Sequence, residues 1–205
     1  DGTPLTVTDY RAAGDGLERL ASYPIWICDR SGQSLAAIRT GIRRLKALCP
    51  ALGIVTVDYL QIMALSAGKS DSKHNALSDV AQGLRNLAKD ESVALVALSQ
   101  LNREVDKRPG GRPQLSDLRD SGAIEAAATH VLFPWREGLA LNPNDPSLAN
   151  QAKLLLAKQT DGPTGEVFVK WHPEYQEFCN MEVASEARWE AQQDFPRGGD
   201  GGPAY

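Results

Sequence analysis

The chain has 205 residues, of which 42% are hydrophobic and 23% charged, and its formal net charge is -4. These values are typical of a soluble globular protein, and the length suffices for one α/β domain with a hydrophobic core. The mild acidity excludes a general polycation, so any contact with nucleic acid must come from a local basic patch. The three cysteines form no CxxC pair, which argues against structural zinc and is typical of a reducing compartment. With no signal peptide and no apolar run that could span a membrane, we expect a cytoplasmic protein.

The first fifty residues or so predict two helices with a strand between them. A helix is expected over residues 8–21, and the apolar run at 24–28 (PIWIC) predicts a strand. Ser34 is a favourable N-cap for a second helix over 34–48, whose apolar residues recur at helical spacing. We interpret the basic side chains of this helix as a solvated surface. They are Arg39, Arg43, Arg44 and Lys46.

The next part of the sequence predicts a strand, a helix and a second strand. The β-branched run at 53–58 has the length and composition of a strand buried on both faces, and it ends in Asp58. A polar loop at 66–73 leads into an amphipathic helix over 77–90, and a second buried strand is expected at 93–98. This order predicts a right-handed βαβ unit with parallel strands.

The rest of the sequence predicts an antiparallel hairpin and a polar end. Strands at 153–158 and 166–171 flank the turn-rich residues 161–165. After about residue 186 the chain is polar and rich in glycine, which predicts a disordered tail. The other expected elements are a locally basic loop at 101–115, a short helix capped by Ser116, broken at Gly122 and resuming through Ala128, strands at 131–133 and 175–179, and a loop at 142–150.

Two polar residues, Asp58 and Gln100, follow directly on the two predicted parallel strands. Since ligands of open α/β sheets bind beyond the carboxyl ends of the strands, we expect the two side chains to converge there. A carboxylate and an amide suit a metal–phosphate site, with Asp58 near Mg²⁺ and Gln100 sensing a γ-phosphate or orienting a water. The alternatives are that Asp58 caps the following turn and that Gln100 bonds loop backbone.

Four sequence blocks, in order and at suitable spacing, together resemble the C-terminal motor domain of DnaB-type replicative helicases. The resemblance covers about residues 1–180, and its strength lies in the combination, since a single apolar run with an Asp is weak. The blocks are IVTVDYLQIM at 54–63, ALSQLNR at 97–103, SDLRDSGAIE at 116–125 and AKQTDGPTG at 157–165.

The resemblance implies a fold, an activity and partners. The fold is α/β, a RecA-like P-loop NTPase core with a mostly parallel sheet flanked by helices and a C-terminal antiparallel hairpin. It is expected to occupy residues 1–185, with 186–205 as the disordered tail and the N-terminal part of the core upstream of Asp1. The implied activity is ATP- and Mg²⁺-dependent 5′-to-3′ translocation on single-stranded DNA by a homo-hexameric ring. A primase and a helicase loader are the implied further partners.

The family pattern also implies roles for individual residues. Asp58 matches the aspartate of the Walker B motif, a ligand of Mg²⁺, and Gln100 matches a glutamine that links the nucleotide site to DNA. Arg119, Asp120 and Gly122 match a loop that grips the DNA backbone, although the family usually has Glu where this chain has Asp120. Arg119 can pair with a phosphate, and Gly122 allows a close approach of backbone. The alternative for Arg119 is a surface ion pair with a neighbouring carboxylate.

Two further matches concern a neighbouring subunit. Lys158 matches a lysine that reaches the neighbour's γ-phosphate, whereas a lysine at a strand end is otherwise solvated. Two positions later, where the family carries an arginine finger, this chain has Thr160. A finger can be worth on the order of 10³–10⁵ in rate, and threonine has no charge to offer. Either Lys158 suffices, or another arginine such as Arg136 substitutes, or the motor is slow or inactive.

No G-x-x-x-x-G-K-[ST] loop, the motif whose backbone cradles the phosphates of P-loop ATPases, occurs in the sequence. The resemblance places this loop upstream of Asp1, so we expect the chain alone neither to bind ATP tightly nor to hydrolyse it. Three hypotheses remain open: part of a ring helicase, part of another RecA-like DNA ATPase, or a degenerate module that binds DNA or a helicase subunit without turnover. The DYLQ and KQ-x-x-GP blocks argue against the second, and Thr160 favours the third.

Overall fold

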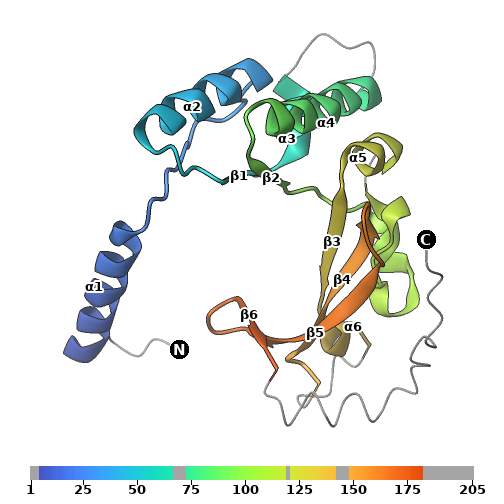
Figure 1. The fold of residues 1–205 in the computed structure, drawn as a ribbon. Helices are drawn as coiled ribbons and strands as arrows, with labels where there is room; N and C mark the ends of the chain where they lie inside the picture. Colours follow the sequence, from blue (N-terminus) through green and yellow to red (C-terminus); the bar gives the residue numbers. More distant parts are fainter. Residues whose placement is uncertain (1–4, 67–72, 119–120, 142–147, 182–205) are drawn as a thin grey trace, which may run out of the picture. The chain divides into compact units, whose positions relative to one another are not determined.

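The computed structural model describes residues 5–66, 73–118, 121–141 and 148–181 (Figure 1). The predicted tail at 186–205 therefore lies outside the described residues. The chain divides into two compact units, residues 1–31 and 32–205. Within the described ranges, no helix is long and apolar enough to cross a membrane.

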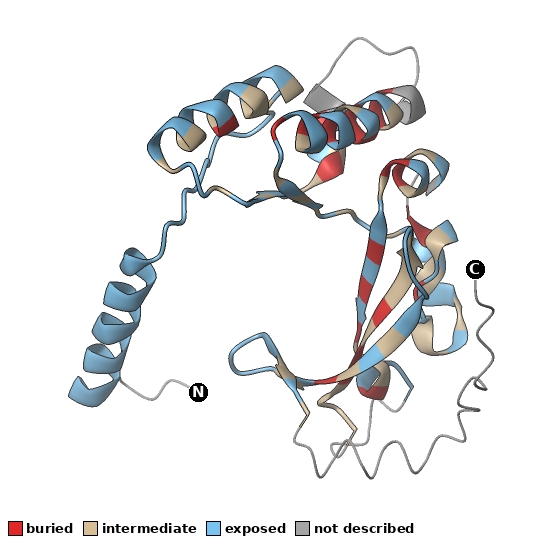
Figure 2. Cartoon of the chain, in the orientation of Figure 1, coloured by how far each residue is buried: buried red, intermediate tan, exposed pale blue. Residues whose placement is uncertain are grey.

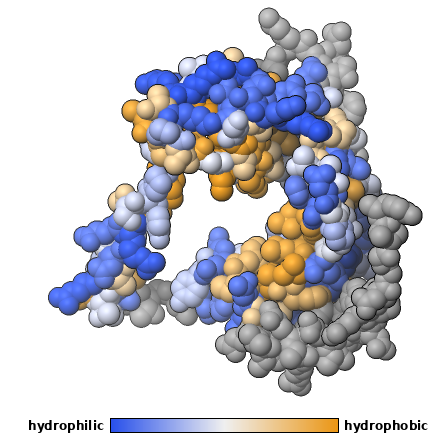
Figure 3. Space-filling view, viewed as in Figure 1, coloured by the Kyte–Doolittle hydropathy of each residue, from blue (hydrophilic) through white to orange (hydrophobic). Residues whose placement is uncertain are grey.

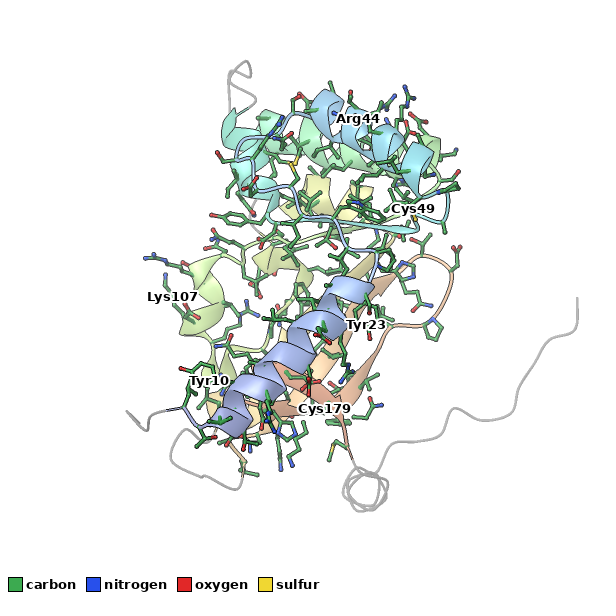
Figure 4. All side chains as sticks on the ribbon, turned by 90° about the vertical axis from the view of Figure 1, so that its left-hand side faces the viewer. Tyr10, Tyr23, Arg44, Cys49, Lys107 and Cys179 are labelled. Carbon is green, nitrogen blue, oxygen red and sulfur yellow. The ribbon has the colours of Figure 1, made fainter. Side chains whose placement is uncertain are left out.

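The first unit contains one helix, α1 (Val7–Ser22), as predicted. Its first turn is fixed by a capping box, because the Thr6 hydroxyl accepts a hydrogen bond from the Asp9 N–H and the Asp9 carboxylate accepts one from the Thr6 N–H. None of its residues is buried. Tyr10 and Tyr23, near the two ends of the helix in Figure 4, are 66% and 55% exposed.

The strand predicted at residues 24–28 is absent, since the segment pairs with no other strand in the part of the chain that the structure describes. Ile27 is 87% exposed. A strand needs a hydrogen-bonded neighbour, and an apolar run alone does not supply one. The prediction of a strand at this position was wrong for that reason.

The second unit begins with helix α2 (Leu35–Leu48), which Ser34 caps as predicted. Its basic face is solvated only in part, since Arg43 and Arg44 are exposed whereas Arg39 and Lys46 are half-buried. Arg43 pairs with the buried carboxylate of Glu91 at 2.9 Å, and Arg39 pairs with Asp90 at 2.9 Å. The Lys46 ammonium donates to the Glu91 carbonyl oxygen. These partners lie at the C-terminal end of helix α4 (Lys73–Asp90), where unpaired carbonyls favour cations.

The parallel pair that the sequence predicts is formed by β1 (Ile54–Val57) and β2 (Ala94–Ala97), with Ile54 opposite Ala94 and Val57 opposite Ala97. Helix α3 (Leu60–Ser66) follows β1, and α4 packs against β2.

The two strands are not buried on both faces, contrary to the prediction. Val57, Leu95 and Ala97 pack against the hydrophobic core, whereas Ile54 is 65% and Val96 48% exposed. Within the second unit, the described residues leave the face that carries Ile54 and Val96 largely exposed, and apolar surface is visible around β1 and β2 in Figure 3. The pattern of the sequence anticipated a cover that the described residues do not supply.

Three short 3₁₀ turns replace the predicted loop at 101–115 and the start of the predicted helix at Ser116. The segment is held by the buried carboxylate of Asp117, which pairs with Arg108 and accepts the Gln114 N–H at 2.8 Å. The Arg108 guanidinium, outweighing the effect of burial, holds the pKa of Asp117 below its ordinary value. The turns are η1 (Arg103–Lys107), η2 (Pro109–Gly111) and η3 (Leu115–Asp117).

Helix α5 (Ser121–Ala127) contains Gly122, so the predicted break at this glycine was wrong. Glycine lowers the stability of a helix but does not end it. Residues 119–120, between η3 and α5, lie outside the described part of the chain.

An antiparallel sheet of four strands, in the order β3-β4-β5-β6, forms the C-terminal part of the described chain. The predicted hairpin is confirmed as β4 and β5, and the sheet is larger than that hairpin because β3 and β6 extend it on either side. Burial alternates along β3, as Figure 2 shows. The elements are β3 (His130–Trp135), α6 (Glu137–Leu141), β4 (Gln151–Gln159), β5 (Gly165–His172) and β6 (Glu177–Asn180).

One hydrophobic cluster joins α3, α4, α5, β3 and β4. Its members include Leu77, Leu84, Phe133 and Leu155, each at most 4% exposed. The three cysteines are free: Cys28, Cys49 at the end of α2 and Cys179 on β6.

Taken together, the elements of the second unit are the helices and the parallel and antiparallel strands of an α/β RecA-like fold.

Candidate nucleotide and nucleic-acid site

Asp58 and Gln100 lie at the carboxyl ends of β1 and β2, which are hydrogen-bonded parallel neighbours. The strand ends are tied together, because the Leu98 N–H donates to the Val57 carbonyl at 2.9 Å and the Leu60 N–H donates to the Leu98 carbonyl at 3.0 Å. The expected placement of the two residues at one edge of the sheet is therefore confirmed.

A side chain that the sequence analysis did not single out, Gln61, joins the first turn of α3 to the loop that follows β2. Its Nε2 donates to the Ser99 hydroxyl at 2.9 Å, and its Oε1 accepts the Gln100 N–H at 3.4 Å. Gln61 belongs to the first block of the family pattern, so that block was the signal that could have identified it. The bridge fixes the backbone of Gln100 and leaves its side chain exposed.

Neither of the purely structural alternatives for Asp58 and Gln100, turn capping and a bond to loop backbone, is seen among the described residues. The Asp58 carboxylate caps no turn there, and the Gln100 amide bonds no loop backbone. Both residues are exposed. An exposed carboxylate and an exposed amide at the same edge of the sheet can take part in binding a hydrated cation and an anion.

One carboxylate is not a complete metal site, and no group of three His, Cys, Asp or Glu side chains that could hold a metal occurs in the described ranges. Mg²⁺, however, commonly takes one or two carboxylates and completes its shell with water and substrate phosphates. Asp58 therefore fits a Mg²⁺ that arrives with a nucleotide, and it does not fit a metal held by protein side chains alone.

Lys158, near the end of β4, is half-buried and not solvated. Its ammonium donates to the carbonyl oxygen of Glu125 in the last turn of α5. The ordinary reading of a lysine at a strand end, a solvated ammonium, is wrong here. The cation instead lies where the unpaired carbonyls of a helix end attract it.

Thr160 lies beyond the end of β4 and is exposed. Its N–H and its hydroxyl both donate to the Thr129 carbonyl at 3.0 Å. Arg136, which we considered as a substitute for the missing arginine, follows the other end of β3, since His130 pairs with Gln159 and Trp135 with Lys153. Six residues of strand separate it from Thr129, on the order of 20 Å. Arg136 therefore does not replace an arginine at Thr160.

The predicted DNA loop is described only in part. Arg119 and Asp120 lie outside the described residues. Gly122 is exposed in the first turn of α5, and a Cβ built on it would meet nothing within 4 Å. The surface at Gly122 is thus open to an approaching ligand.

Arg85 on α4 is a further residue that the sequence analysis missed. Its guanidinium donates to the Ala126 carbonyl at 3.0 Å, next to the carbonyl that Lys158 contacts. No sequence pattern identifies it, because the partner is a backbone atom 41 residues further along the chain.

Comparison with known proteins decides the family of this chain. The sequence pattern described as "DnaB-like helicase C terminal domain" matches residues 2–180. The chain belongs to the DnaB-like helicase C-terminal domain family. Its sequence is 39% identical over 164 residues to the probable replicative DNA helicase of Trieres chinensis, covering 79% of this chain and 36% of that protein. The chain thus spans about a third of the length of this curated relative.

Two solved structures resemble this DnaB-like chain, each with a TM-score of 0.78, 33% identity and coverage of 87% of the chain. One is described as a DnaB-like replicative helicase and its interactions with primase, of which 42% is covered. The other is described as an ATPase domain, of which 62% is covered. These matches confirm the family and the α/β RecA-like fold expected from the four sequence blocks.

Proposed function

We propose that this chain is the downstream part of the motor of an ATP-dependent replicative DNA helicase, which translocates on single-stranded DNA and unwinds the duplex at the fork. The observation that carries the proposal is that Asp58 and Gln100 follow the carboxyl ends of two paired parallel strands in a DnaB-like domain. The relatives named as a replicative helicase and as an ATPase domain support ATP as the fuel.

Within this proposal, Asp58 holds Mg²⁺ and Gln100 senses the γ-phosphate or orients the attacking water. When bound, Mg²⁺ neutralises charge on the phosphates. Lys158 reaches the γ-phosphate of a neighbouring subunit in a homo-hexameric ring. Arg119, Asp120 and Gly122 grip single-stranded DNA in the channel. Primase is a proposed partner, supported by the description of one similar structure, and a helicase loader is another.

Substitution of Asp58 tests the proposed Mg²⁺ site in the complete protein. Asp58→Asn keeps the shape but removes the charge that binds the cation. Loss of groups that merely orient metal ligands costs about 10–100-fold, so we expect DNA-stimulated ATP turnover to fall by at least about 100-fold. Asp15→Asn, an exposed carboxylate on α1, is the matched control and should change nothing. Wild-type turnover in Asp58→Asn would mean that the metal site lies elsewhere.

The 205-residue chain alone is proposed to be inactive, because its sequence carries no phosphate-cradling loop. Steady ATP hydrolysis by the purified chain, abolished by Asp58→Asn, would contradict this statement. Trace hydrolysis that Asp58→Asn does not change would indicate contamination.

A second candidate is a degenerate RecA-like module that binds DNA or helicase subunits without turnover. Thr160 favours it, since its hydroxyl is already bonded to the Thr129 carbonyl and carries no charge toward a neighbour. In the complete protein, Thr160→Arg should raise ATP turnover if the motor is attenuated. A fully restored finger supplies on the order of 10³–10⁵-fold. Thr160→Val, which lacks both charge and hydroxyl, is the control. A motor already fully active with Thr160 would show no gain.

A further inference from the structure

The last turn of α5 is held by cations from two different elements. The final carbonyls of a helix have no partner within the helix. In α5, the Lys158 ammonium from β4 donates to the Glu125 carbonyl, and the Arg85 guanidinium from α4 donates to the Ala126 carbonyl at 3.0 Å. Beyond the helix, the Thr129 carbonyl accepts from Thr160. The two neighbouring carbonyls of α5 thus depend on different side chains.

The two cations differ in the competing partners open to them, although Arg85 is exposed and Lys158 is half-buried. Arg85 extends from α4, whose apolar face is anchored in the core by Leu84 and Leu87, at most 2% exposed. Under the proposed function, Lys158 has a competing partner in a neighbour's phosphate. Charged phosphate oxygens are stronger acceptors than a neutral carbonyl, so an engaged Lys158 weakens its bond to Glu125. Arg85 then becomes the remaining side-chain donor to the end of α5 among the described residues.

We propose that Arg85 is a positioning residue, which holds the C-terminal end of α5 while Lys158 moves between the Glu125 carbonyl and a phosphate. This inference rests on the proposed function. It makes α5 a connection between its N-terminal end, which adjoins the proposed DNA-gripping residues 119–122, and the lysine that acts on the neighbouring nucleotide. Arg85 does not touch DNA or nucleotide in this role and acts only through the helix.

The competing explanation is that Arg85 is a helix cap with no functional consequence. A cap changes the stability of α5 but affects DNA-free and DNA-stimulated turnover alike. A positioning residue changes their ratio, because the ratio reports how well DNA bound at one end of α5 influences the site at the other. The ratio therefore distinguishes the two explanations.

The test uses the complete protein with Arg85→Met, which retains an apolar stem but loses the donor, and Arg85→Lys, which restores a cation. Lys89→Met is the matched control, since Lys89 is exposed one turn further along α4. ATP turnover is measured with and without oligo-dT. Hydrogen exchange is measured at the backbone amides of residues 122–128.

We expect Arg85→Met to speed exchange in α5 about two- to fivefold, the range that a cation at a helix C-terminus supplies. The DNA stimulation ratio should fall by a similar factor with DNA-free turnover unchanged, Arg85→Lys should recover most of it, and Lys89→Met should change neither quantity. Unchanged exchange, an unchanged ratio, or an equal fall of both turnover rates in Arg85→Met would overturn the inference alone. A wild-type protein without DNA-stimulated turnover would overturn the proposed function and the coupling together.

Discussion

The two sheets of this chain carry the two halves of the proposed site, and the sheets differ in how deeply their residues are buried. Strands β3 and β4 place Phe133 and Leu155 in the core, and the sheet they belong to has four strands. The β1–β2 sheet has only two strands, and none of their residues is buried. Within the second unit, one face of this pair, the bare face below, is largely exposed among the described residues. Lys158 lies on the packed sheet, and Asp58 and Gln100 follow the bare one.

This difference indicates what holds each residue in place. The backbone at Lys158 is fixed by strand pairing on a buried sheet, and its ammonium donates to the Glu125 carbonyl near the end of α5. Asp58 and Gln100 depend on the β1–β2 hydrogen bonds and on the Gln61 bridge. We therefore expect the geometry at Asp58 to be the more sensitive of the two to what covers the bare face.

Replacing one apolar side chain on each sheet with alanine tests this difference in burial most directly. Phe133, 4% exposed on β3, should cost about 3–5 kcal/mol of unfolding free energy when replaced by alanine. Ile54 is 65% exposed on β1, and Ile54→Ala should stay within about 0.5 kcal/mol, the usual range for surface substitutions. Urea denaturation of the 205-residue chain measures both. Equal losses would mean that the bare face is covered in solution.

Local patterns predicted local structure well. The Ser34 cap, the amphipathic face of α4 and the β4–β5 hairpin each depend on residues close in sequence, and each is confirmed. The parallel β1–β2 pair joins residues 40 positions apart, and it is confirmed because the order strand, helix, strand predicts it. The strands at 53–58 and 93–98 were expected to be buried on both faces, and that part of the prediction was wrong. Burial depends on what packs against a strand, and composition does not report the packing partner.

The same limit explains what was missed in the site. Placement of Asp58 and Gln100 at one edge followed from strand order alone, so it could be predicted. The partner of Lys158 could not, since it is a backbone carbonyl 33 residues away and any residue type supplies one. The carboxylate partners of Arg39 and Arg43 were missed for a similar reason. Their spacing places them on one face of α2, but only the fold brings Asp90 and Glu91 to that face.

The connection between the two sheets provides the smaller and sharper test. Residues 101–118 lead from β2 towards α5, and they are held by the Arg108–Asp117 ion pair and the short Leu101–Leu118 bridge. Asp117 is 3% exposed. Arg108→Met leaves this carboxylate without its charged partner, and we expect a loss of about 2 kcal/mol in unfolding free energy, within the roughly 1–3 kcal/mol typical of such groups. Arg44→Met, an exposed arginine on α2 (Figure 4), is the control.

Acid should weaken the same connection, and the sign follows from the direction of the pKa shift. The pKa of Asp117 is held below its ordinary value of 3.8 by Arg108, so the folded state binds the proton less readily than the unfolded state. The stabilisation is complete above that value and is lost as the pH falls below it. Unfolding free energies measured from about pH 6 to pH 3 should therefore drop more steeply in wild type than in Arg108→Met. Asp9, whose pKa is also lowered by its hydrogen bonds with Thr6, contributes equally to both proteins and cancels in the difference. Parallel pH profiles would show that the connection is held by its backbone turns and not by the ion pair.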